Sequence, residues 1–305
     1  MSANHTIPEK ASVRGVLYYR HRLPVRIMHW LNVICLCTLL LSGLGIFNAH
    51  PALYWGQSSY STRPAVLEIG AHAEASAPSV AGQASDPADD APEDDIGEVK
   101  GMLRIGGHSF DTTGVLGVST TADGRINEHA FPSWLTIPGN YSLAESRSWH
   151  FFFAWLLIIN GLAYVVYLLL SGHLRRDLLP DTDEVRGIPA SIVDHLRFRH
   201  PQGEAAKRYN VLQKLAYLIV IFVLLPLIVL MGMAMSPMLD AVLTGWVDWF
   251  GGRQSARTIH FIVAWLLVAF VLIHVFEVIV SGLWNHLRSM ITGYYAIQAD
   301  KQKGD

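Results

Sequence analysis

Four histidines lie in or at the edge of long apolar stretches of this sequence. They are His29, His150, His260 and His274. Ionisable side chains are costly inside a membrane, so those that occur there are expected to be functional. His260 and His274 are fourteen residues apart, which in a helix is a rise of about 21 Å and nearly a whole number of turns. This spacing predicts two ligand positions on one face of a helix, at opposite depths.

The elements that must position these histidines are four apolar segments. The chain has 305 residues, of which 51% are apolar and 16% charged, and its mean hydropathy is positive, as is typical of membrane proteins. A helix needs about twenty apolar residues to cross the hydrocarbon core, where its backbone groups must bond internally. We therefore predict an all-α membrane protein, a bundle of four transmembrane helices near residues 25–47, 149–171, 212–235 and 258–282.

Lysine and arginine are unevenly distributed among the connections. They gather in the N-terminal segment 1–24, the second connection 172–211 and the tail 283–305, and are sparse in the connections 48–148 and 236–257. Connections rich in positive charge stay on the cytoplasmic side. We therefore predict a multi-pass membrane protein with both termini cytoplasmic and the connections 48–148 and 236–257 on the outer side. The formal net charge of -2 gives no indication of nucleic-acid binding.

The first connection, of about a hundred residues, is too long to be a simple link between two helices. Its middle, Ala71–Glu98, is rich in Ala, Ser, Pro, Asp and Glu and has almost no aromatic residue. Such a composition predicts a disordered acidic stretch. The flanking sequences contain β-branched residues and turn signals of Gly and Pro, which predict a small cap over the outer mouth of the bundle.

The predicted topology sorts the four histidines by depth. His29 and His274 fall near the inner, cytoplasmic side, and His150 and His260 fall near the outer side. Two facing imidazoles suit the two axial positions of a haem iron, so we predict two b haems. Zinc is the main inorganic alternative, but its sites need three or four ligands close together. A lone transmembrane histidine can also serve only as a hydrogen-bonding residue between helices.

Three of these histidines follow an arginine in the pattern R-x-x-H, and the arginines are Arg26, Arg147 and Arg257. Three residues are about one helical turn, so each arginine lies on the face of its histidine but nearer the water. A planar guanidinium suits a carboxylate, so we predict that these arginines bind haem propionates. No C-x-x-C-H is present, which excludes covalently attached haem. The other histidines fall in loops or at helix ends and are predicted to be solvated.

Several motifs together resemble a known family. They are P-V-R-I-M-H-W in the first predicted helix, R-S-W-H-F-F-F-A-W in the second, K-R-Y-N-V-L-Q-K at the third, R-T-I-H and L-I-H in the fourth, and F-P-S-W-L outside the membrane. They resemble the bacterial cytochrome b561 and nickel-hydrogenase-type b cytochromes, and among these the thiosulfate-reductase-like cytochrome b subunits. The resemblance covers all four spans. It implies a di-haem subunit that passes electrons between the quinone pool and a periplasmic redox subunit, for example a molybdenum enzyme.

The resemblance also implies a quinone site at the start of the third helix. The asparagine of the family corresponds to Asn210, and Gln213 and Lys214 would offer further hydrogen bonds to a quinone carbonyl. The alternative is that Asn210 only caps the helix. A second function of the same fold is a stand-alone superoxide:quinone oxidoreductase, which a positive outer surface would favour, whereas the outer connection here is acidic. A transporter or structural anchor would hold no haem.

Overall fold

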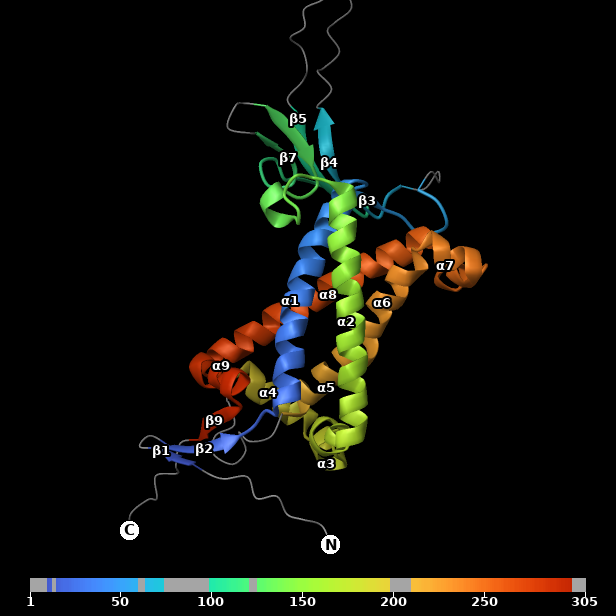
Figure 1. Ribbon diagram of the computed structural model, residues 1–305. Coiled ribbons are helices and arrows are strands. Elements are labelled where there is room, and N and C mark those ends of the chain that lie inside the picture. Colours follow the sequence, from blue (N-terminus) through green and yellow to red (C-terminus); the bar gives the residue numbers. More distant parts are fainter. Residues whose placement is uncertain are drawn as a thin grey trace, which may run out of the picture. The chain divides into compact units, whose positions relative to one another are not determined.

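The computed structural model (Figure 1) describes residues 10–12, 15–59, 64–73, 99–120, 125–197 and 210–297. The chain divides into two compact units. Unit 1 comprises Met1–Leu36, Trp155–Leu230 and His260–Asp305, and unit 2 comprises Cys37–Ala154 and Met231–Ile259. Because the long helices cross this division, each unit contains parts of several of them.

Within the described residues, four helices are long and apolar enough to cross a membrane. They are α1 (Leu23–Asn48), α2 (Leu143–Ser171), the helical segment Val211–Ala234 and α8 (Arg253–Val280). They confirm the all-α membrane class and the four predicted spans. Three of them are longer than predicted. The helix α1 extends by one or two residues at each end, whereas α2 and α8 already begin at Leu143 and Arg253, in the polar sequence that precedes each apolar core.

The third span is not a uniform α-helix. It consists of α5 (Val211–Ile219), a π turn η4 (Val220–Leu224) and α6 (Leu225–Ala234). Pro226 is the second residue of α6. A proline has no backbone N–H and its ring crowds the carbonyl of the preceding turn, so a wider π turn before Pro226 relieves both problems. The sequence predicts the span here but not this change of helical pitch.

The described part of unit 1 also contains a small sheet and several short helices. The strands β1 (Lys10–Ser12), β2 (Gly15–Tyr19) and β9 (Tyr294–Ile297) form an antiparallel sheet in the order β1-β2-β9. The sheet joins the segment before α1 to the segment after α9 (Leu283–Thr292), although no strand was predicted in either. The connection after α2 forms a π turn η2 (Leu174–Leu178), then α3 (Thr182–Arg186) and α4 (Ile188–Leu196).

Unit 2 contains the predicted cap. Strands β3 (Ala52–Leu53), β4 (Leu67–Ala73), β5 (Val99–Ile105) and β6 (His108–Asp111) form one antiparallel sheet, and β7 (Gly117–Thr120) pairs with β8 (Ile126–His129). The described part of unit 2 also contains two 3-10 turns and a short helix, which are η1 (Ser133–Leu135), η5 (Trp246–Phe250) and α7 (Pro237–Val242).

The boundary predicted for the acidic stretch Ala71–Glu98 is wrong at its start. Residues 71–73 belong to β4, where Ala71 pairs with Gly101 and Ala73 pairs with Val99. Alanine is uncommon in strands, but the backbone hydrogen bonds to β5 hold this segment in the sheet. Composition alone does not indicate such pairing. Residues 74–98 lie outside the described residues.

Two glycines allow the two sheets of the cap to cross closely. A Cβ on Gly101 of β5 would lie 2.2 Å from the carbonyl oxygen of Leu116, and one on Gly117 would lie 2.7 Å from that of Gly70. Gly117 also has φ +84°, which disfavours other residues. Next to this crossing, at the end of β8, His129 is only 7% exposed. The expectation that it is solvated is therefore wrong.

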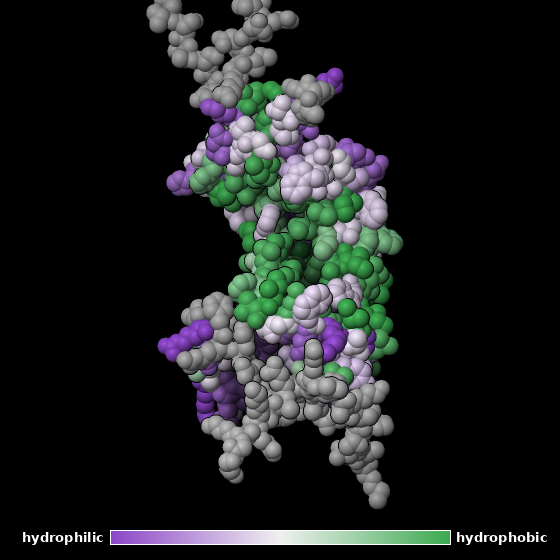
Figure 2. Space-filling model, turned by 90° about the vertical axis from the view of Figure 1, so that its left-hand side faces the viewer, coloured by the Kyte–Doolittle hydropathy of each residue, from purple (hydrophilic) through white to green (hydrophobic). Residues whose placement is uncertain are grey.

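The long helices carry large apolar side chains that are open to their surroundings. Leu170 is 84% exposed, Phe152 65% and Leu272 66%. On the face shown in Figure 2, hydrophobic side chains gather over the helices. Apolar surface of this extent suits contact with lipid, as the four membrane spans require.

Candidate haem sites and a polar cavity

His29 and His274 come together in unit 1, as their pairing predicts. The ring centres lie 6.3 Å apart, and the ring planes are inclined by 69°. An imidazole nitrogen bound to a metal lies about 2 Å from it, so two imidazoles on opposite sides of one ion have ring centres roughly 6 Å apart. The separation therefore suits the prediction that both imidazoles would hold one haem.

Aromatic side chains hold both rings of this pair. Phe270, one turn before His274 on α8, stacks on the His274 ring with a centroid distance of 6.0 Å and an interplanar angle of 14°. Trp30 meets the His29 ring edge to face at 5.5 Å. Such packing limits the rotation of the imidazoles and surrounds them with apolar surface, which suits a porphyrin.

His150 on α2 lies against α1 in unit 2. Its Nδ1 is 3.1 Å from the hydroxyl of Ser42, and that hydroxyl lies 2.6 Å from the carbonyl oxygen of Thr38. Since Ser42 donates its single proton to Thr38, it accepts from the Nδ1–H of His150. This assigns the tautomer in which Nε2 carries the lone pair. A Cβ on Gly43 would lie 3.4 Å from the His150 ring, so a small residue there allows the close approach.

His260 on α8 has the same tautomer for a different reason. Its Nδ1 is 2.9 Å from the carbonyl oxygen of Ile228 on α6. A carbonyl only accepts, so Nδ1 carries the proton and Nε2 the lone pair. Histidines that bind metals commonly donate the second ring N–H in this way, which fixes the ring. His150 and His260 belong to different units, and their pairing stays a prediction.

The three arginines of the R-x-x-H pattern have other contacts in the structure. Arg257 donates to the carbonyl oxygens of Ala52, at 3.0 Å, and of His50, and its guanidinium lies 5.6 Å from the Phe47 ring centre. It thereby joins the start of α8 to the first segment of the cap. This contact was not predicted, and propionate binding by Arg257 stays a prediction.

Arg26 and Arg147 also make contacts that were not predicted. The guanidinium of Arg26 donates to the carbonyl oxygen of Ile291 near the end of α9. Arg147 is exposed, and its guanidinium lies over the Phe151 ring at 5.6 Å. Arg26 and Arg257 donate hydrogen bonds to backbone carbonyls, whereas Arg147 contacts a ring. The hydrogen-bonding groups of Arg147 are therefore the most accessible of the three to a carboxylate.

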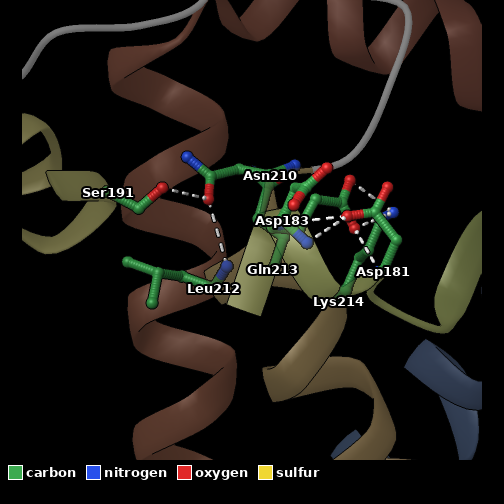
Figure 3. Close-up of polar contacts among 8 residues, drawn as sticks. Asp181, Asp183, Ser191, Asn210, Leu212, Gln213 and Lys214 are labelled. Atoms are coloured by element: carbon green, nitrogen blue, oxygen red, sulfur yellow. Dashed lines mark hydrogen bonds and ion pairs between the residues drawn. The ribbon is translucent and has the colours of Figure 1, made fainter. Parts of the chain in front are cut away.

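Two of the three predicted quinone ligands form the cap of α5 (Figure 3). Asn210 Oδ1 accepts from the backbone N–H of Leu212 at 3.0 Å and from the hydroxyl of Ser191 at 3.3 Å. Gln213 Oε1 accepts from the backbone N–H of Asn210 at 3.3 Å. These bonds are the reciprocal capping box of a helix start. The capping alternative therefore describes the contacts of both residues, and their quinone role stays a prediction.

Lys214, the third predicted quinone ligand, is buried. Its Nζ donates to both carboxylate oxygens of Glu184 on α3, each at 2.8 Å. Glu184 Oε2 also accepts from the backbone N–H of Asp181, which in turn caps α3. Charged groups are rarely buried unless they are paired and hydrogen-bonded, and this pair meets both conditions. Nothing in the sequence indicates that Glu184 meets a residue thirty positions later.

Lys214 and Glu184 line a polar cavity of about 630 Å³ in unit 1. Val25 also lines it, and Val25 precedes His29 by one turn on the same face of α1. The volume is within the range of small-molecule sites. The cavity therefore brings a charged pair to the helix that carries a predicted haem ligand.

His21 lies in the same cavity. Its pKa is lowered to about 4, first by burial and then by the positive charge of Arg20 and by His286, His29 and His173. At neutral pH the imidazole is therefore uncharged, and the expectation that it is an ordinary solvated histidine is wrong. Burial is the main cause of the shift, and the charge of Arg20 adds to it.

A polar contact between α1 and α2 was not predicted. Asn160 on α2 is 6% exposed, and its Nδ2 donates to the carbonyl oxygen of Met28 at 3.0 Å and to Asn32 Oδ1 at 2.7 Å. Met28 directly precedes His29. Asparagines within apolar segments are the signal that would have identified this contact, since amides between membrane helices join them.

Comparison with known proteins places these residues in a family. Residues 108–293, more than half of the chain, match the family model for prokaryotic cytochrome b561. This range contains His150, His260 and His274 but not His29. A candidate protein-methionine-sulfoxide reductase subunit, YedZ1, from Azospira oryzae is 34% identical over 167 residues, which are 53% of this chain and 77% of that protein. The chain therefore belongs to the prokaryotic cytochrome b561 family of membrane electron-transport proteins, which bind haem b.

Proposed function

We propose that this protein carries electrons from a quinol in the bacterial inner membrane, through two b haems, to a redox subunit in the periplasm. The contact that carries the proposal is the one between His29 and His274, whose ring centres are 6.3 Å apart. His260 is fourteen residues from His274 on the unbroken helix α8, which separates two haem levels by about 21 Å.

The second haem is proposed at His150 and His260. Their shared tautomer supports this assignment, because in each ring the proton lies on Nδ1 and the lone pair on Nε2, as in histidines that bind metals. When bound, each haem would supply one-electron chemistry. The residues of the chain fix the imidazoles and exclude water, and Arg26, Arg147 and Arg257 are proposed to bind the propionates.

The quinol is proposed to react in the polar cavity. Lys214 in its wall supports this site, because a hydrogen-bond donor can bind a quinone oxygen and Val25 of the same wall lies one turn from His29. Asn210 and Gln213 are assigned a supporting role, since the cap that they form begins the helix on which Lys214 lies.

The name of the Azospira oryzae relative supports a partner enzyme. That protein is named as a subunit of a protein-methionine-sulfoxide reductase, so a reductase would draw electrons from quinol. The proposal places the cap of unit 2 on the periplasmic side, as the distribution of lysine and arginine indicates, where it would meet such a subunit. A molybdenum enzyme is the partner class that the sequence resemblance implies.

The test is purification of the protein from membranes with its haem. A pyridine haemochrome assay is expected to give two b haems per chain, and anaerobic mixing with a soluble quinol analogue is expected to reduce them. A co-purifying periplasmic subunit, analysed for its metal, identifies the partner. A chain with one haem, or haems that quinol does not reduce, contradicts the proposal. Haem reduction by superoxide followed by quinone reduction, without any partner, would favour the stand-alone oxidoreductase instead.

A further inference from the structure

Two acid-base pairs line the polar cavity. One is Glu184 with Lys214, from α3 and α5, and the other is His173 with Asp177, at the turn η2. The oxidation of one quinol releases two electrons and two protons. In the proposed function the electrons pass to the haem that His29 and His274 would hold, and the protons need acceptors of their own.

The Glu184–Lys214 pair extends from the protein interior toward water. The side chain of Lys214 is 8% exposed, and that of Glu184 is 27% exposed. The bond from the backbone N–H of Asp181 holds the Glu184 carboxylate in place. A carboxylate fixed at the edge of a cavity can take a proton from a bound ligand and release it to solvent.

The His173–Asp177 pair has the arrangement of an oriented base. Nδ1 of His173 lies 2.5 Å from Oδ2 of Asp177. Since the carboxylate accepts the Nδ1 proton, Nε2 of His173 carries the lone pair. A carboxylate in this position holds the imidazole in one tautomer and stabilises its protonated form. The side chains are 21% and 46% exposed, so a proton on this pair also has access to water.

The other charged groups of the cavity are mainly positive. Arg20 and Arg22 come from the segment before α1, together with the uncharged His21, while Arg175 and Arg176 come from η2 and Asp181 from the start of α3. Asp181 is occupied as the cap of α3. Tyr18, Tyr19 and Tyr167 complete the titratable lining. Positive charge around the cavity favours the anions that form when a quinol loses protons.

We infer that Glu184 and His173 are the proton acceptors for the two hydroxyl groups of the quinol, with Lys214 and Asp177 positioning them. The inference rests on the proposed function. Each quinol O–H bond that breaks would give its proton to one acceptor and leave one electron for the haem that His29 and His274 would hold. The oxidation would yield a quinone, two electrons for that haem and two protons released to water.

The experiment measures haem reduction in the full-length holoprotein by a soluble quinol analogue, in anaerobic stopped-flow mixing over a range of pH. The variants are Glu184→Gln and Asp177→Asn, with Glu184→Asp as the conservative rescue. Asp183→Asn is the matched control, because Asp183 lies on the same helix with a side chain that is 89% exposed and pairs with Arg186. Dithionite-reduced spectra check that each variant keeps both haems.

Glu184→Gln and Asp177→Asn are each expected to lower the limiting rate at saturating quinol by roughly a hundredfold and to change its pH profile. The quinol concentration at half-saturation should stay nearly constant, and Glu184→Asp should recover much of the rate.

If both variants keep the wild-type rate and pH profile, the inference is overturned while the proposed function stands. Asp177→Asn decides the matter even if Glu184→Gln does not fold, because Asp177 is half exposed. Wild-type protein that quinol does not reduce overturns the proposed function and this inference together.

Discussion

The imidazoles of His29 and His274 lie 6.3 Å apart although 245 positions separate them in the chain (274 minus 29). His29 lies near the start of α1, and His274 lies near the end of α8. One iron between them would tie the first span of the chain to the last. Loss of either ligand should therefore have the same consequence for the cofactor.

The first prediction is that His29→Ala and His274→Ala each remove the same haem, while His150→Ala and His260→Ala each remove the other. A haem that loses one of two axial histidines is held much more weakly. Reduced-minus-oxidised spectra and redox titrations of the four variants measure this, with His108→Ala on the exposed strand β6 as control. Loss of one and the same redox component in His29→Ala and His150→Ala would show that the pairing is wrong.

The second prediction concerns Ser42, which accepts the Nδ1 proton of His150. If His150 holds a haem as proposed, this bond would make the imidazole a better electron donor to the iron and would favour the ferric state. Ser42→Ala should raise the midpoint potential of the corresponding haem by up to about 40 mV, the equivalent of one hydrogen bond of about 1 kcal/mol for a one-electron couple. The potential of the other haem should not move.

Ser148→Ala is the control for this measurement, because Ser148 is on the same helix α2 and bonds only to the exposed backbone of Ala144. Equal shifts in Ser42→Ala and Ser148→Ala, or a shift confined to the haem of His29 and His274, would contradict the assigned hydrogen bond.

Local signals in the sequence account for the parts of the structure that were predicted. Apolar runs of sufficient length give the four spans, and the regular rise of a helix places His260 and His274 on one face. Neither inference depends on which segments of the chain contact one another in the folded protein. The pairing of His29 with His274 followed because the lysine and arginine distribution fixed the direction of each helix.

Contacts between distant segments could not be predicted in this way. Lys214 meets Glu184 because short helices after α2 turn the chain back, and composition does not specify that path. Asn160 binds the carbonyl oxygen of Met28 across 132 positions. The pairing of β2 with β9 depends on two short strands that are weak signals when each is considered alone.

The third prediction is that the cap becomes less stable in acid because of His129. Burial lowers the pKa of His129 below its ordinary value of 6.5, and its ring stacks on Tyr141 at 5.6 Å. A hydrogen bond with the backbone of Asn127 favours the protonated ring, but burial is the larger effect. Below pH 6.5 the unfolded chain binds this proton more readily than the folded cap, so the free energy of unfolding falls as the pH decreases toward the folded-state pKa.

His129→Phe should keep the stacking on Tyr141 and remove this acid sensitivity, because the phenyl ring has no proton to bind. Amide hydrogen exchange of β7 and β8 at pH 5 and pH 8 measures it, with rates corrected for the intrinsic effect of pH. The variant should be better protected than the wild type at the lower pH only. The same substitution at the exposed His108 is the control, and equal protection of wild type and His129→Phe at pH 5 would exclude the mechanism.

The fourth prediction separates the two roles considered for Asn210. Its Oδ1 caps α5. Its Nδ2 donates no hydrogen bond to another described residue. Asn210→Ser keeps a side-chain oxygen that can cap the helix but removes the amide, whereas Asn210→Leu removes both. If capping is the main role, the serine variant should match the wild type in stability and in quinol kinetics, and the leucine variant should lose about 1 kcal/mol of stability.

Denaturant unfolding and stopped-flow haem reduction by a quinol analogue measure the two effects. A serine variant that is as stable as the wild type but needs about tenfold more quinol for half-saturation, the cost of one lost hydrogen bond, would instead show that the amide of Asn210 binds the quinone.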